Sequence, residues 1–224
     1  GAHGRRIPVS LPRRPRVLLA DDHLMVAEAL TSLLASDFDL VGVVEDGRAL
    51  VEAAGRLRPD VIVADVTMPH LNGIDALVQL RQDGFRIPVV FLTMHRDVNF
   101  ARRALDAGAS GFVLKHSASD ELVAAIHAAL EGKTYLTPQL AAEVLKAMKQ
   151  EPGNNGDPLA SITARQREVL QLLAEGQSAK QIAARLSISA RTVEFHKYQM
   201  MESLGLQSNA ELIHFAIKHG LVEL

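Results

Sequence analysis

The chain has 224 residues, of which 48% are hydrophobic and 22% are charged, with a formal net charge of −2. These values are ordinary for a globular protein of one or two domains and exclude a disordered chain. Cysteine is absent, which excludes disulfides and cysteine-based zinc sites and fits the reducing cytoplasm. No apolar run approaches the roughly 20 residues that span a bilayer, so no membrane partner is expected.

The first 132 residues alternate short apolar runs with segments of helical periodicity. The apolar runs predict five strands, at 17–20, 40–44, 61–65, 89–92 and 111–114. Helical spacing predicts helices after each of them, at about 26–34, 47–57, 74–82, 98–108 and 119–132. Five β-α units in alternation are typical of a doubly wound parallel sheet.

Four of the five predicted strands end on polar side chains: Asp21 with Asp22, then Asp65, Thr93 and Lys115. Ligands of open α/β sheets bind outside the carboxyl ends of the strands, so these groups are expected to converge. Three carboxylates together repel one another unless a cation lies between them, and oxygen ligands at a wet edge suit Mg²⁺. Metal, ammonium and hydroxyl groups together complement a phosphoryl group. A carboxylate can itself accept that group as an acyl phosphate.

The rest of the chain is predicted to be helical. Thr137-Pro138 opens a helix to about residue 150, and the Pro-, Gly- and Asn-rich segment 151–158 predicts a flexible linker. Four helices follow, and their N-termini are indicated by Thr163 with Gln166, Ser178, Ser189, and Ser208 with Glu211, the first and last as capping boxes. A short helix, a turn and a longer helix in the middle indicate an all-α helix-turn-helix domain. The predicted domains are 14–132, a helix and linker at 133–158, and 159–224.

The longer helix after Ser189 is the candidate DNA-reading element. Helical arithmetic predicts an inward stripe of Val193, His196, Met200 and Leu204 and an outward stripe of Arg191, Glu194, Phe195 and Tyr198, with Lys197 beside it. The domain from residue 159 carries seven Lys and Arg against six Asp and Glu, so its affinity for DNA phosphates must come from a few well-placed basic side chains. The candidates are Lys180, Arg185, Arg191 and Lys197. Glu194 can accept a hydrogen bond from cytosine N4, or it can simply favour the helix N-terminus.

These motifs, in this order, resemble the NarL/FixJ family of two-component response regulators. The segments that carry the resemblance are Leu-Leu-Ala-Asp-Asp at 18–22, Asp-Val-Thr-Met-Pro at 65–69 with Asn72-Gly73, Phe-Leu-Thr at 91–93, and Phe-Val-Leu-Lys at 112–115. The resemblance covers nearly the whole chain, as a receiver domain of flavodoxin-like fold followed by a LuxR-type helix-turn-helix.

The resemblance implies a role for each pocket residue. Asp65 is the implied phosphoacceptor. Mg²⁺ ligands are implied to be Asp22 and Asp65 directly, Asp21 through water, and the backbone carbonyl of Thr67. Thr93 and Lys115 are implied to bind the phosphoryl oxygens, and Phe112 occupies the aromatic switch position. On phosphorylation Thr93 is expected to move toward the phosphoryl group and Phe112, partly exposed before, to turn inward. Thr67 and His95 flank the pocket at positions where receivers vary.

The implied function is that of a cytoplasmic transcription regulator, phosphorylated on Asp65 by a sensor histidine kinase. Because the DNA-binding half carries a net charge of only +1, we expect weak DNA binding by a monomer and a homodimer, when phosphorylated, on a two-half-site operator. No enzyme activity is expected beyond self-phosphorylation and slow self-dephosphorylation. One alternative is a receiver-fold regulator that is controlled without phosphate. Another is a phosphatase of the haloacid-dehalogenase type, although such enzymes need a second Asp where Thr67 stands.

Overall fold

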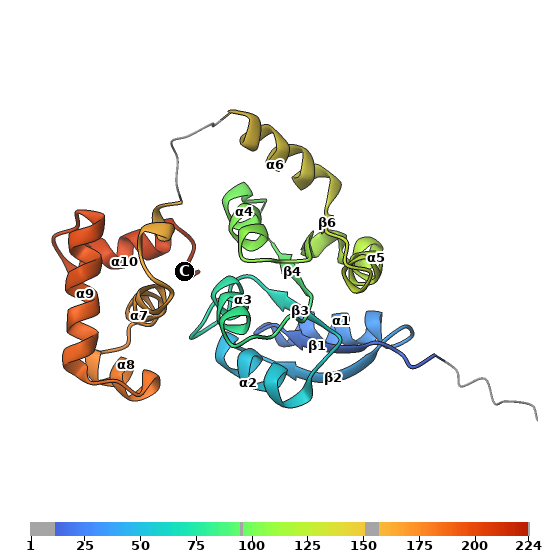
Figure 1. Ribbon diagram of the computed structural model, residues 1–224, viewed down its shortest axis with the longest axis horizontal. Coiled ribbons are helices and arrows are strands. Elements are labelled where there is room, and N and C mark those ends of the chain that lie inside the picture. The colour runs from blue at the N-terminus through green and yellow to red at the C-terminus, as the bar shows by residue number, and fades with distance from the viewer. Residues whose placement is uncertain (1–11, 95, 151–156, 224) are drawn as a thin grey trace, which may run out of the picture.

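The structure is a computed structural model that describes residues 12–94, 96–150 and 157–223. It contains an α/β part and a helical part (Figure 1). The α/β part is a parallel sheet in the order β2-β1-β3-β4-β5-β6. Its strands are β1 (Arg16–Ala20), β2 (Asp39–Val44), β3 (Val61–Asp65), β4 (Val89–Thr93), β5 (Gly111–Leu114) and β6 (Tyr135–Leu136). The predicted doubly wound parallel sheet is therefore confirmed, and β6 adds a short sixth strand.

Helices cover both faces of the sheet, as apolar parallel strands require. One face packs against α2 (Gly47–Leu57), α3 (Gly73–Gln82) and α4 (Val98–Asp106), and the other against α1 (Leu24–Leu34) and α5 (Ala118–Leu130). A short 3-10 turn, η1 (Lys115–Ser117), connects β5 to α5. Alternate residues of each strand enter the two cores: Leu18 and Ile62 lie in one, and Val17 and Val61 lie in the other.

The segment predicted as a separate helix and linker is in large part an extension of the α/β part. β6 pairs with β5, and α6 (Pro138–Gln150) packs Leu140 and Val144 into the same core as Phe112. The Thr137 hydroxyl, which is fully buried, accepts a hydrogen bond from the Leu114 amide. The predicted boundary at residue 132 is therefore too early, because residues 135–144 complete the core beside β5. The predicted linker lies outside the described residues except for Asp157 and Pro158.

The helical part contains η2 (Pro158–Ser161), α7 (Ala164–Ala174), α8 (Ala179–Leu186), α9 (Ala190–Leu204) and α10 (Asn209–Lys218). α7 and α8 begin with full capping boxes at Thr163 and Ser178. The capping box expected at Ser208 is only half formed: the Ser208 side chain accepts from the Glu211 amide, whereas the Glu211 carboxylate accepts from the Gln207 amide instead. The short-turn-long pair α8–α9 is the predicted helix-turn-helix.

The two parts pack together through α7, which lies against α3 and the loop before it. α9 lies on the far side of the helical part from the sheet (Figure 1). Among the residues described, no helix is long and apolar enough to cross a membrane.

Candidate phosphorylation pocket and DNA-reading surface

Asp21, Asp65 and Lys115 meet at the carboxyl edge of the sheet, as their positions after β1, β3 and β5 predicted. The Lys115 ammonium lies 2.8 Å from Asp65 Oδ2 and 2.8 Å from Asp21 Oδ2. All three side chains are nearly buried. Apart from the Lys115 ammonium, Asp21 Oδ2 has no hydrogen-bond partner among the described residues. A single ammonium thus faces two buried carboxylates, and one carboxylate oxygen keeps coordination capacity.

Asp22 and His23 extend this group toward solvent. Ligand atoms of Asp21, Asp22, His23 and Asp65 all lie within 4.8 Å of one another, an arrangement that could hold a metal ion. His23 Nδ1 lies 3.2 Å from Asp21 Oδ1 and 3.3 Å from Asp22 Oδ1. Sequence reasoning missed His23, although its position directly after the acidic pair was a usable signal. Three carboxylates supply the oxygen donors that Mg²⁺ prefers, so the residues fit that ion.

The pocket changes the acidity of its central carboxyl. Burial raises the pKa of Asp65 to about 6, against the opposing effect of the Lys115 ammonium. Burial lowers the pKa of Lys115, but the charge of Asp65 and the hydrogen bonds that the ammonium donates to both carboxylates outweigh it and leave that pKa raised. Asp65 therefore takes up a proton near neutrality more readily than an ordinary aspartate, while Lys115 stays charged.

The backbone after Asp65 is held by two close approaches. The Gly73 amide donates to the Val66 carbonyl at 2.7 Å, and a Cβ on Gly73 would lie 2.2 Å from the Asp65 carbonyl oxygen. Only glycine fits there. The Asn72 side chain accepts from the Asp75 amide at 2.9 Å and begins α3. The loop 66–72 therefore returns directly beneath the candidate phosphoacceptor.

Thr93 and Phe112 lie near this edge, on neighbouring strands. Thr93 ends β4 and is buried, and Phe112 lies in the middle of β5. The expectation that Phe112 is partly exposed is wrong, because β6 and α6 cover β5 and leave its ring fully buried. His95, expected to flank the pocket, lies outside the described residues; Thr67 does flank it, and its amide lies 3.4 Å from Asp65 Oδ1.

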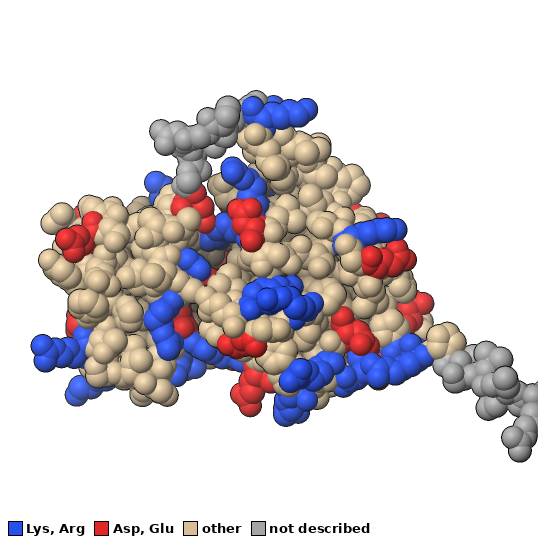
Figure 2. All heavy atoms as spheres, in the orientation of Figure 1, with Lys and Arg blue, Asp and Glu red and all other residues tan. Residues whose placement is uncertain are grey.

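The outward face of α9 carries the predicted stripe. Phe195 is 56% exposed and Tyr198 63%, and Arg191 and Glu194 are also exposed. Lys180 and Arg185 are exposed on α8. In Figure 2 the surface over α9 is largely uncharged, and basic side chains gather near the end of the helical part where α8 lies.

The placement of Lys197 beside this stripe is wrong. Lys197 is only 7% exposed, and its ammonium lies 3.4 Å from a Glu194 carboxylate oxygen. The physical reason is that Val193, Lys197 and Met200 follow the i, i+4, i+7 spacing of the packed side. His196 is half-buried, and burial, followed by the charge of Arg165, lowers its pKa. Both residues border the core.

A doubly wound parallel sheet with an acidic pocket at its carboxyl edge, followed by a helix-turn-helix, defines the class of receiver-linked DNA-binding regulators. The chain matches the family described as response regulator receiver domain over residues 17–127. It also matches the family of bacterial regulatory proteins, luxR family, over residues 160–216.

The chain is similar over almost its whole length to known regulators. It is 32% identical to the oxygen regulatory protein NreC of Staphylococcus aureus over 215 residues, which are 93% of this chain and 99% of that one. Among solved structures, the Salmonella typhimurium RcsB response regulator is 26% identical with a TM-score of 0.57, covering 91% of this chain and 98% of that chain. An RcsB–DNA complex matches with 26% identity, a TM-score of 0.56 and the same coverage. The chain therefore belongs to the response regulators that join a receiver domain to a LuxR-type DNA-binding domain.

Proposed function

We propose that Asp65 accepts a phosphoryl group and that its phosphorylation controls DNA binding by α9. The observation that supports this most directly is the placement of Lys115 Nζ at 2.8 Å from Asp65 Oδ2, beside the Asp21 and Asp22 carboxylates. In the transfer, the bond from phosphorus to the donor nitrogen or oxygen breaks as a bond from phosphorus to an Asp65 oxygen forms. Lys115 and Thr93 bind the phosphoryl oxygens. The donor is a phosphohistidine of a sensor kinase, or a small acyl phosphate.

Mg²⁺ would be held by Asp21, Asp22, Asp65 and the backbone carbonyl of Thr67. When bound it supplies positive charge to the phosphoryl oxygens, which favours transfer between two anionic groups. The chain's own contribution is to keep Asp65 in place through the loop 66–73 and to keep Lys115 charged. Because its ammonium is paired with two carboxylates, Lys115 is positioned before the donor arrives.

Phosphate transfer can be tested by intact mass. Incubation with Mg²⁺ and a small acyl phosphate should add the mass of one phosphoryl group to the protein, and Asp65→Asn should abolish the gain. Asp37→Asn removes an exposed carboxylate in the turn between α1 and β2; it is the matched control and should gain as wild type does. A wild-type protein that stays unmodified, or an Asp65→Asn variant that gains equally, would contradict the proposal.

Mg²⁺ affinity should depend on pH through Asp65. Because the pKa of Asp65 is raised to about 6, protons compete with the metal below that pH. Apparent affinity should be nearly constant above pH 7 and fall by up to about tenfold per unit as pH drops below 6. Calorimetric titrations between pH 5 and 8 measure this. Asp22→Asn should weaken Mg²⁺ binding at every pH, but the pH below which affinity falls should stay near 6. If the affinity of wild type fell only below about pH 4, the usual range of an aspartate, Asp65 would not be the group that competes with the metal.

DNA binding is proposed to use the outward face of α9 in the major groove, with one α9 from each subunit of a homodimer on a two-half-site operator. Arg191, Glu194, Phe195 and Tyr198 would face the bases and backbone. Lys180 on α8 would contact phosphate. Lys197 would not contact DNA itself but would hold the Glu194 side chain in place, because its ammonium lies beside that carboxylate.

The salt dependence of DNA binding distinguishes the two basic residues of α9. Arg191→Gln should lower the slope of log affinity against log salt by about one per subunit, because one phosphate contact is lost. Lys197→Gln is the matched control and should leave the slope unchanged while lowering stability. Fluorescence anisotropy between 50 and 300 mM salt (about the usual range) measures both. Equal changes in slope would mean that Lys197 reaches the DNA after all.

A further inference from the structure

The exposed face of α9 offers DNA a carboxylate and an aromatic ring where base edges are read. Arg191, Glu194, Phe195 and Tyr198 are all exposed, and their spacing places them on one side of the helix. The N-terminal part of a recognition helix contacts the bases, so Glu194 and Phe195, in the second turn, are placed to reach them. A carboxylate only accepts hydrogen bonds and a phenyl ring forms none of ordinary strength, so neither can donate to guanine.

The N-terminus of α9 does not need Glu194. Ser189 caps the helix, and its side chain accepts from the Thr192 amide at 3.0 Å. The first turn contains no acidic residue, and Glu194 follows four residues of helix that begin at Ala190. Because the favourable effect of the helix dipole on a negative charge falls off within the first turn, it gives little reason for this carboxylate. Of the two roles that the sequence leaves open for Glu194, the structure favours contact with a base.

Lys197 makes a carboxylate acceptable on a surface that approaches DNA phosphates. Its ammonium donates to Glu194 Oε1 at 3.4 Å, and the lysine side chain is 9% exposed whereas that of Glu194 is 58% exposed. The cation therefore lies on the inner side of the carboxylate and offsets part of its charge. Among the described residues, Glu194 Oε2 has no hydrogen-bond donor. One oxygen is held by the helix, and the other is open to a donor from outside.

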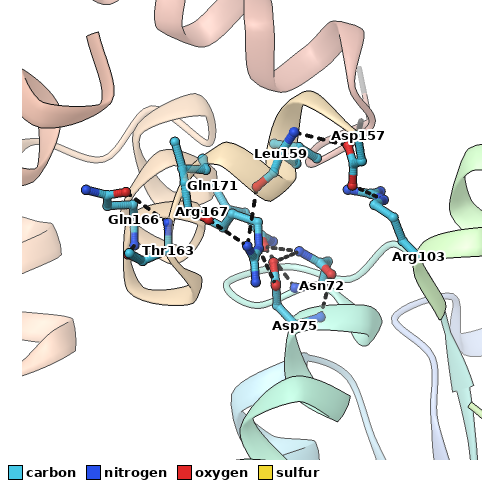
Figure 3. A network of polar contacts seen from close by, with 10 residues as sticks. Asn72, Asp75, Arg103, Asp157, Leu159, Thr163, Gln166, Arg167 and Gln171 are labelled. Carbon is cyan, nitrogen blue, oxygen red and sulfur yellow. Dashed lines mark hydrogen bonds and ion pairs between the residues drawn. The ribbon is translucent and has the colours of Figure 1, made fainter. Parts of the chain in front are cut away.

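The neighbouring amide that could have read adenine is already occupied. Gln199 Oε1 accepts from Gln166 Nε2 at 3.3 Å. Gln166 in turn forms the capping box of α7 with Thr163, as Figure 3 shows. Gln199 is therefore tied to α7 rather than directed outward. The side chains left to read bases are an acceptor, Glu194, and an apolar surface, Phe195.

We propose that α9 reads pyrimidines: Glu194 accepts a hydrogen bond from the N4 amino group of a cytosine, and Phe195 contacts the methyl group of a nearby thymine. This rests on the proposed function, in which α9 enters the major groove, and it names the bases that define each half-site. Cytosine presents only a donor in the major groove, whereas adenine adds the N7 acceptor that would face the carboxylate, and guanine presents acceptors alone.

The cytosine contact is tested by changing the acceptor. Full-length protein should select, from a random DNA pool with phosphodonor and Mg²⁺, half-sites with one invariant cytosine that it prefers by roughly 5- to 150-fold. Glu194→Gln should change that base to adenine, because a glutamine amide forms two hydrogen bonds with adenine N6 and N7. A merely structural role of Glu194 would not exchange one base for another. Glu202→Gln, exposed near the C-terminal end of α9, is the matched control and should select the wild-type sequence.

The thymine contact is tested on the DNA. Replacing the selected thymine by deoxyuracil removes only its methyl group and should weaken wild-type binding by about threefold or more, the effect of losing one buried apolar carbon. Phe195→Ser should bind the thymine and deoxyuracil operators equally. Anisotropy titrations of the full chain measure both. Equal binding of the two operators by wild type would refute the role of Phe195.

The outcomes separate base reading from DNA binding itself. A folded Glu194→Gln variant that still prefers cytosine would overturn the pyrimidine reading and leave the proposed function intact. A wild-type protein that binds no DNA with or without donor would overturn both. If Glu194→Gln does not fold, the selected cytosine is replaced by pyrimidin-2-one, which lacks the amino group. Wild type should then lose about fivefold or more in affinity, and unchanged affinity would overturn the proposal.

Discussion

Asp65→Asn is expected to abolish the gain in DNA affinity that a phosphodonor produces in wild type. Coupling between two sites in a protein is typically 5- to 150-fold, so we expect wild type to gain about tenfold or more. The variant should bind operator DNA with the weaker affinity of unphosphorylated protein whether or not donor and Mg²⁺ are present. The physical reason is that an amide side chain cannot form the acyl phosphate whose charge drives the change. Binding curves from anisotropy, with and without donor, measure it.

The alternative regulator that is controlled without phosphate predicts a different result. Under that reading, wild type and Asp65→Asn bind DNA equally well with donor present. Asp37→Asn serves again as the control for loss of a carboxylate far from the pocket. A variant that is permanently tighter than wild type would indicate that the negative charge of Asp65 itself restrains binding, which would contradict the charge-switch mechanism.

Leu140→Ala is expected to destabilise the receiver domain by about 2–5 kcal/mol, the cost of emptying a buried leucine site. Leu140 lies on α6 and is fully buried in the core that includes Phe112 and Val144. Loss of its side chain should therefore also loosen the cover of β5. Denaturant unfolding followed at the receiver transition gives the free energy of unfolding.

The matched control lies five residues farther along the same helix. Leu145 is 59% exposed, so Leu145→Ala should change the free energy of unfolding by no more than about 0.5 kcal/mol. Equal effects of the two substitutions, or no effect of Leu140→Ala, would mean that α6 does not contribute to the receiver core.

The sequence predicted most of the sheet and its pocket because both follow local rules. Alternating apolar runs and helical segments predict a doubly wound parallel sheet, and parallel strands bring their carboxyl ends to one edge. Asp21, Asp65 and Lys115 therefore had to meet once β1, β3 and β5 formed. Helix N-termini were equally local, since the side chains of Thr163, Ser178 and Ser189 accept hydrogen bonds from amides three positions ahead.

Sequence reasoning failed where packing between distant segments decides. The side of α9 that packs inward depends on where α7 and α8 lie, and Lys197 lies on that side, contrary to the prediction. Burial of Phe112 depends on β6 and α6, whose short strand of two residues gives no periodic signal. One signal was present in the sequence of α7: Gln171 lies between Leu170 and Leu172, which are core residues, and a glutamine within such an apolar run indicates a helix packed on more than one side.

The sequence by itself determined the order of elements, the acidic pocket around Asp65 and the helix-turn-helix, because each depends on short-range spacing and on the geometry of a parallel sheet. Only the tertiary structure decided that α7 forms hydrogen bonds with the loop after Asp65. Gln171 lies 99 residues from Asn72 and 103 from Met68, and hydrogen bonds across such separations depend on how two domains dock. The loop that follows Asp65 therefore has hydrogen-bond partners in the DNA-binding domain as well as in the receiver.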